Sequence, residues 1–111
     1  MNRDQQIDKI QAAVEAADHI PADKKAELLG LLSRLKPAIA KASQTHQDHA
    51  EKIVRLVEAS AHEMTHAEKK PGAIRKLVRE LEQSVEKFEA SHPDLVAAVT
   101  EYSALLSALG I

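Results

Sequence analysis

The 111-residue chain contains no cysteine and no tryptophan, and it has one phenylalanine, one tyrosine and three glycines. The absence of cysteine excludes disulfides, thiolate metal sites and cysteine nucleophiles. With so few glycines, the chain offers neither a glycine-rich phosphate loop nor the G-x-S-x-G turn of many serine hydrolases. A chain this poor in large side chains builds a thin core, which suits helices laid side by side.

The chain also lacks a strong charge imbalance and a long apolar run. Fifteen Lys and Arg against seventeen Asp and Glu leave a formal net charge of −2, which gives no general attraction to nucleic acid or to an anionic membrane. The amino terminus has no basic start followed by an apolar stretch, so we expect no secretory signal. The longest runs of apolar or glycine character, 28–32 and 95–99, fall far short of the roughly 20 residues that span a bilayer. We therefore expect a cytoplasmic protein without nucleic-acid or membrane partners.

What the sequence does contain is helical periodicity. Apolar residues recur at spacings of three and four nearly everywhere, and no stretch alternates with a period of two. This pattern predicts an all-α fold, an elongated antiparallel bundle of four or five helices in one domain spanning 1–111. The predicted helices cover approximately 4–18, 22–36, 38–69, 73–90 and 93–109. Pro37 is ambiguous, because it either separates two helices or kinks a single one.

The segment 38–69 contains neither proline nor glycine and predicts one central helix about 45 Å long. His46 and His49 fall on its apolar stripe, so we expect both in the core or at an interface. A rod of this length leaves apolar surface uncovered unless it pairs, which favours a homodimer or higher oligomer. At a twofold axis the two histidines would meet their mates, where they would bind a metal ion or make assembly sensitive to pH.

Gly30 interrupts the most apolar of the predicted helices, 22–36. A glycine inside a helix costs about 1 kcal/mol relative to alanine. We expect a close contact with a neighbouring helix to offset this cost.

His62-Glu63-Met64-Thr65-His66 has the H-E-x-x-H pattern, which on a helix projects two imidazoles to one side where they can bind Zn²⁺. Three observations oppose a zincin-like metallopeptidase. No third ligand follows at the expected spacing, no strand is predicted to hold a substrate, and a helical wheel turns His62 and His66 away from the buried stripe. We therefore expect a solvated helix face here, with metal binding by His62 and His66 as the alternative.

A group of basic residues surrounds the turn near residue 70. Its members are Lys69, Lys70, Arg75, Lys76 and Arg79. A phosphate or nucleic-acid site is the functional interpretation, but no aromatic residue lies among them for base stacking. A solvated face is the favoured interpretation.

Near the carboxyl end, residues 88–95 read Phe-Glu-Ala-Ser-His-Pro-Asp-Leu, and the chain ends in Gly110-Ile111. Ser91 is suited to cap a last helix that has Pro93 just inside it, and Phe88 can pack across this corner. With its F-E-x-S-H-P-x-L segment and its Gly-Ile ending, the chain resembles a family of small bacterial proteins catalogued as a domain of unknown function. The resemblance covers about the last 35 residues. It implies a short helical bacterial protein and transfers no catalytic or binding residue.

Together these features predict a non-enzymatic helical interaction or scaffold protein that forms homo-oligomers. An unidentified protein is a further candidate partner. We expect no cofactor and no catalytic residue. The alternative is a histidine-based metal-binding protein using His62 and His66, or His46 and His49 at a dimer interface. A metallopeptidase is a distant third.

Overall fold

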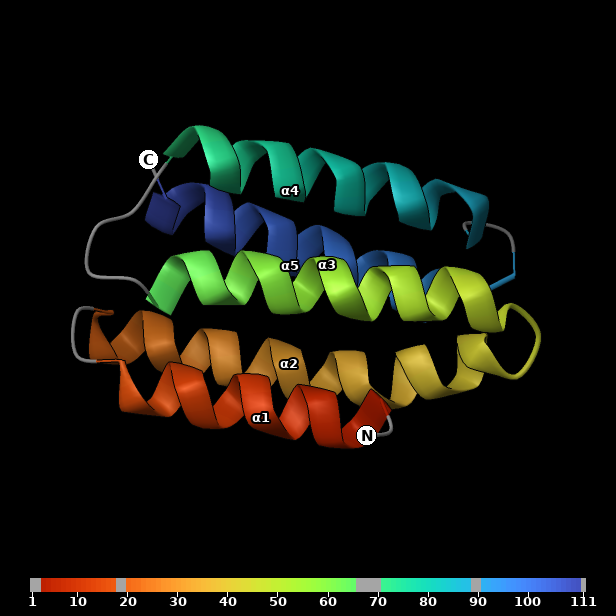
Figure 1. Cartoon of the computed structure of the whole chain (residues 1–111), viewed down its shortest axis with the longest axis horizontal. Coiled ribbons are helices and arrows are strands. Elements are labelled where there is room, and N and C mark those ends of the chain that lie inside the picture. The colour runs from red at the N-terminus through yellow and green to blue at the C-terminus, as the bar shows by residue number, and fades with distance from the viewer. Residues whose placement is uncertain (1–2, 18–19, 66–70, 89–90, 111) are drawn as a thin grey trace.

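The computed structural model describes residues 3–17, 20–65, 71–88 and 91–110, which form five α-helices and one short 3₁₀ helix (Figure 1). The α-helices are α1 (Arg3–Ala16), α2 (Ala22–Ser43), α3 (Gln47–Thr65), α4 (Pro71–Val85) and α5 (Pro93–Gly110), and the 3₁₀ helix is η1 (Glu86–Phe88). The described ranges contain no strand, so the all-α prediction is confirmed. None of the described helices is both long enough and apolar enough to cross a membrane.

The helices run antiparallel to their neighbours in the chain (Figure 1). Contacts between α2 and α3, α3 and α4, α4 and α5, and α5 and α2 close a ring of four helices, while α1 lies against α2 and α3. The protein is therefore a four-helix bundle with a fifth helix in one of its outer grooves. It measures 37 × 25 × 22 Å.

The prediction of one long helix over 38–69 is wrong. Helix α2 continues through Pro37 to Ser43, and the chain turns before α3 begins at Gln47. Hydrogen bonds between residues three apart, as in a 3₁₀ helix, tighten the end of α2. The Gln44 amide donates to the Lys41 carbonyl at 3.3 Å, and the Thr45 amide donates to the Ala42 carbonyl at 3.2 Å. Pro37 therefore neither ends nor begins a helix.

Hydroxyl side chains support this turn, which has no proline or glycine. Ser43 Oγ donates to the Ala40 carbonyl at 2.7 Å, and Thr45 Oγ1 donates to the Ala42 carbonyl at 3.4 Å. Such local bonds compete with continuation of the helix. Because the chain reverses here, the longest dimension of the molecule is 37 Å, and the apolar stripe of the expected rod is divided between two helices that pack on each other.

The core forms along the stripes that the three- and four-residue spacings predict. Ile7, Ile10, Val14 and Ala17 are buried as expected. The largest fully buried side chains include Tyr102, Phe88, Leu28, Leu32, Leu35, Ile39, Ile53, Met64, Ile74, Leu81 and Leu95. The aliphatic core therefore extends through every described α-helix.

The carboxyl-terminal corner differs in one detail from its prediction. Helix α5 begins at Pro93, so His92 occupies the capping position, and its carbonyl accepts bonds from the amides of Leu95 at 3.1 Å and Val96 at 3.3 Å. Ser91 lies one residue earlier. Phe88, which is 1% exposed, fills the corner as expected.

Candidate functional site

The H-E-x-x-H segment lies at the carboxyl end of α3. His62 is exposed and Glu63 is half-buried, while Thr65 Oγ1 donates to the His62 carbonyl at 2.8 Å. The prediction that His62 faces away from the core is confirmed. His66 lies outside the described residues, as do Lys69 and Lys70 of the basic group. Arg75, Lys76 and Arg79 are exposed on α4, as a solvated face requires.

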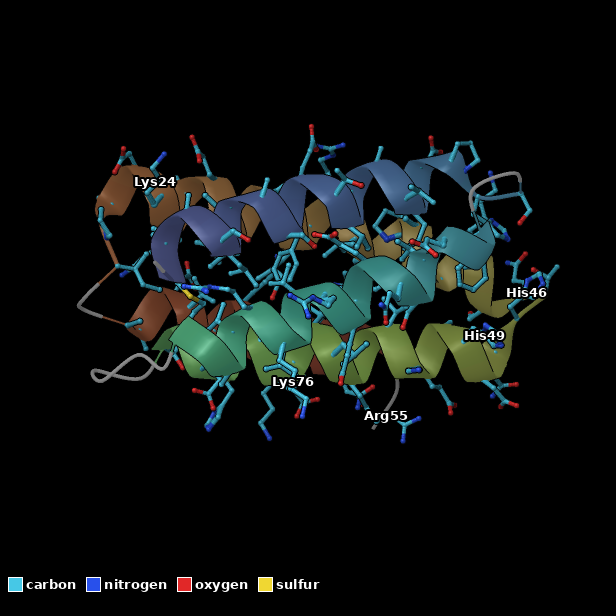
Figure 2. All side chains as sticks on the ribbon, turned by 90° about the horizontal axis from the view of Figure 1, so that it is seen from above. Lys24, His46, His49, Arg55 and Lys76 are labelled. Carbon is cyan, nitrogen blue, oxygen red and sulfur yellow. The ribbon has the colours of Figure 1, made fainter. Side chains whose placement is uncertain are left out.

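His46 and His49 occupy one end of the bundle (Figure 2). The expectation that both belong to a buried helical stripe is wrong for His46, which is exposed in the turn before α3, and His49 is half-buried. The helical wheel failed because it assumed a continuous helix from residue 38, whereas the turn at 44–46 rotates the second helix relative to the first.

The structure brings a third histidine to this end. The ring centroid of His46 lies 6.3 Å from that of His49 and 6.1 Å from that of His92. Thr45 Oγ1 lies 2.8 Å from Nδ1 of His46 and 3.3 Å from Nε2 of His92. Sequence spacing did not reveal this approach, because it requires the α4–α5 corner to return to the α2–α3 turn.

Phe88 lies among the three imidazoles. Its ring centroid is 5.2 Å from that of His46, 5.8 Å from that of His49 and 5.7 Å from that of His92, with edge-on geometry in each case. Edge-to-face packing of this kind is favourable between aromatic rings. Among the residues that the structure describes, no three histidine or acidic side chains are placed to hold one metal ion. In this geometry the cluster closes the end of the apolar core.

A buried polar contact joins α3 to α5 inside the core. The Tyr102 hydroxyl lies 3.1 Å from the Val57 carbonyl oxygen and 2.8 Å from Ser60 Oγ, and Ser60 Oγ lies 3.0 Å from the same carbonyl, so two hydroxyl protons are shared among three contacts. Burial raises the pKa of Tyr102, and the hydrogen bond to Ser60 only partly opposes this rise. Because Ser60 and Tyr102 are closed to solvent, this contact has a structural role: it fixes the register of α3 and α5.

An open groove follows the outer seam between α2 and α5. One part of it has a floor of apolar and small residues that includes Gly30, Leu31, Ala104 and Leu105. A second hollow on the same seam is lined by Pro37, Ala38, Ala97 and Ala98. Figure 2 shows α5 lying along α2, on the side of the molecule opposite Arg55 and Lys76.

Gly30 contradicts the expectation of a close helix contact within the chain. A methyl group built on its Cα would meet nothing within 4 Å. The residue is exposed on α2 and faces the groove. No contact with the described part of the chain therefore offsets the cost of a glycine at this helical position.

Charged side chains border the groove at two levels. Arg34 of α2 forms an ion pair with Glu101 of α5. One level further along, Lys41 of α2 and Asp94 of α5 line the same hollow, and neither joins an ion pair with any residue that the structure describes. Each level thus combines a positive charge on α2 with a negative charge on α5.

The other outer seams have a different character. The hollow between α3 and α4 is lined mainly by polar and charged residues, among them Asp48, Lys52 and Arg55. The hollow between α4 and α5 carries Glu82 and Glu86. The α2–α5 seam is the most apolar of the three, and it is the candidate functional surface of this protein.

Comparisons with protein-family models, with curated proteins and with solved structures found no match to this chain. The resemblance of residues 88–95 to a bacterial family therefore stays a prediction.

Proposed function

We propose that the protein acts without catalysis, as a helical interaction protein whose copies associate through the α2–α5 groove. The observation that carries this proposal is the position of Gly30 in an exposed apolar groove, where a side chain would meet nothing. A glycine costs stability in a helix, so its presence is accounted for when a second molecule approaches the α2 backbone closely.

The groove replaces the expected rod as the basis for association. Apart from His46 and His49, the stripe of the rod is buried inside one subunit where the structure describes it, because α2 and α3 pack on each other. Ala97 and Ala104 on α5 are exposed beside Gly30 and Pro37 on α2. Small side chains of this kind allow another helix to approach closely, and burial of their apolar surface favours association.

Light scattering over a range of concentrations tests the proposal. We expect the wild-type mass to rise reversibly above 12.1 kDa as concentration increases. Ala104→Glu introduces a charge into the groove and should keep the protein monomeric. Ala13→Glu is the matched control, because Ala13 is exposed on α1 away from this seam. A wild-type mass of 12.1 kDa at every concentration would refute the proposal.

Histidine-based metal binding is a second candidate, favoured by the position of the His46 ring beside those of His49 and His92. Because no three described side chains are placed around one ion, a pair of imidazoles would bind the metal. Imidazole is a good ligand for Zn²⁺ and Ni²⁺. Titration calorimetry with each metal tests this function: it requires binding that His46→Ala and His92→Ala abolish and that His62→Ala leaves intact. The absence of binding heat would eliminate the candidate.

A further inference from the structure

We infer that two copies pair about a twofold axis parallel to α2 and α5, so that α2 of each copy lies on α5 of the other. This inference rests on the proposed function, which requires only that copies meet at the groove. It adds the symmetry of the interface and the charges that determine it.

The first step is the register of the two helices. Helices α2 and α5 run antiparallel, and the ion pair between Arg34 and Glu101 sets them side by side at one level. Lys41 lies seven residues after Arg34, and Asp94 lies seven residues before Glu101. Seven residues make two helical turns, so each pair of charges returns to the same side of the seam.

The second step is the choice between two symmetries. A twofold axis along the helices keeps each residue at its level and places α2 on α5 of the second copy. Arg34 then faces Glu101 of the second copy, and Lys41 faces Asp94. An axis across the helices places α2 on α2 and α5 on α5. When it passes at the level of the Arg34–Glu101 pair, Arg34 faces Arg34 and Glu101 faces Glu101. The crosswise axis thus opposes two pairs of like charge, and it also opposes two pairs of opposite charge, between Glu27 and Lys41. The lengthwise axis opposes four pairs of opposite charge and none of like charge, so the charges favour the lengthwise axis.

The third step is the size of the contact. Eighteen residues of α5 extend about 27 Å, and two helices side by side present a strip about 20 Å wide. Two such strips bury roughly 1,000 Å² in total, at the lower limit for a specific interface. Because Gly30, Ala97 and Ala104 are small, the helices can approach closely enough for that area to be well packed. A reversible dimer with micromolar affinity is expected.

Two charge-reversal variants, Lys41→Glu and Asp94→Lys, test this symmetry. Each should weaken the dimer alone, and a mixture of the two should restore it only if the two positions meet across the interface. With Lys41→Glu alone, the new glutamate lies opposite Asp94 of the second copy at two places in each dimer. Asp94→Lys alone opposes two lysines in the same way. Each variant should associate about tenfold more weakly than wild type. Mixed in equal amounts, they form a heterodimer in which both intermolecular pairs are again of opposite charge, and its affinity should return to within about threefold of wild type.

Native mass spectrometry of the mixture measures the heterodimer against both homodimers. Mixing cannot repair a charge clash inside one subunit, so restored affinity has an intermolecular cause. Thermal melting followed by circular dichroism, at concentrations where each variant is monomeric, serves as the control for folding. Lys41 and Asp94 are both exposed, so wild-type melting is expected.

A second mixture separates the two symmetries. In the crosswise arrangement, Glu27 lies opposite Lys41 of the second copy, because the two residues lie seven positions on either side of Arg34. Glu27→Lys mixed with Lys41→Glu would then restore full affinity, whereas the lengthwise arrangement leaves one clash. Restoration by this mixture and not by the first overturns the inference but retains the proposed function. A wild-type chain that never dimerises overturns both.

Discussion

The two outer grooves that contain α2 differ in how they are covered. The groove shared with α3 is covered by α1, which buries Ile7, Ile10 and Val14. The groove shared with α5 is open, and its floor carries the small residues Gly30 and Ala104 beside Leu31 and Leu105. One groove is completed by the chain itself, whereas the other has the small residues and paired charges of a surface suited to a second molecule.

Polar contacts reinforce this difference. Along the covered groove, α1 is fastened at its margin, where Lys36 Nζ lies 2.6 Å from Asp8 Oδ1 and Gln11 Nε2 donates to Ser33 Oγ at 2.8 Å. Along the open groove, Lys41 and Asp94 have opposite charges and no ion pair among the described residues. The Arg34–Glu101 ion pair is formed within the chain along the open groove, so the difference lies at the next level, where Lys41 and Asp94 stay available for a second molecule.

The largest expected effect comes from the covered groove. Ile10→Ala removes a side chain that is 4% exposed between α1 and the rest of the bundle. The lost burial and the cavity should lower the free energy of unfolding by about 2–4 kcal/mol, as measured by urea denaturation. Ala104→Glu in the open groove should change it by less than about 0.5 kcal/mol. Equal losses would erase the distinction between the two grooves.

Tyr102→Phe tests whether the buried contact of Tyr102 with Ser60 and Val57 of α3 stabilises the position of α5. Loss of the buried hydroxyl should lower the free energy of unfolding by about 1 kcal/mol, because Ser60 loses one of its partners. The pKa of the folded Tyr102 is raised by burial, whereas in the unfolded chain it lies near 10. Its contribution is therefore complete below about pH 10 and is lost as the pH rises toward the folded pKa.

Ultraviolet absorption of tyrosinate measures the ionisation of Tyr102 directly, since Tyr102 is the chain's single tyrosine and tryptophan is absent. Ionisation should coincide with loss of the circular dichroism signal, and Tyr102→Phe should unfold at a higher pH. Ionisation near pH 10 in a fully folded protein would contradict the burial of this ring.

Gly30→Ala should separate folding from association. The added methyl group meets nothing within the subunit, so the higher helix propensity of alanine should raise the free energy of unfolding by up to about 1 kcal/mol. The same methyl group keeps a second helix at a distance and should weaken the dimer. Melting of the monomer and light scattering should therefore move in opposite directions. A variant with both a more stable monomer and a tighter dimer would show that Gly30 does not contribute to the interface.

The smallest effects are expected from the exposed ion pairs on the two sides of α2. Asp8→Asn and Glu101→Gln each remove one carboxylate, and all four paired side chains are at least one-third exposed. Each variant should lose less than about 1 kcal/mol of folding stability in low salt. Only Glu101→Gln should weaken association. A dimer equally sensitive to Asp8→Asn would locate the interface elsewhere.

Much of the fold could be predicted because it follows from local periodicity. The spacing of Ile7, Ile10 and Val14 correctly predicts the buried face of α1, and Pro21 and Pro93 correctly mark the starts of α2 and α5 to within one residue. The break at 44–46 could not be predicted in this way. It depends on Ser43 and Thr45 bonding the last carbonyls of α2, and neither residue is a strong helix breaker.

The candidate site was less predictable because it depends on packing between helices. A helical wheel was sufficient to turn His62 outward, since it lies within one uninterrupted helix. It failed for His46 across the unrecognised turn, and no local pattern could bring His92 beside it. The sequence marked Gly30 as unusual, but only the structure reveals that the space beside it is empty.

Nuclear magnetic resonance of the isotope-labelled chain, recorded as its concentration rises, compares the two grooves in a single measurement. Copies that meet at the α2–α5 groove should shift the backbone amide signals of Gly30, Arg34, Ala97 and Glu101, while those of Asp8 and Gln11 stay fixed. Shifts confined to α1, or spectra that do not change with concentration, would contradict the assignment of the open groove as the meeting surface.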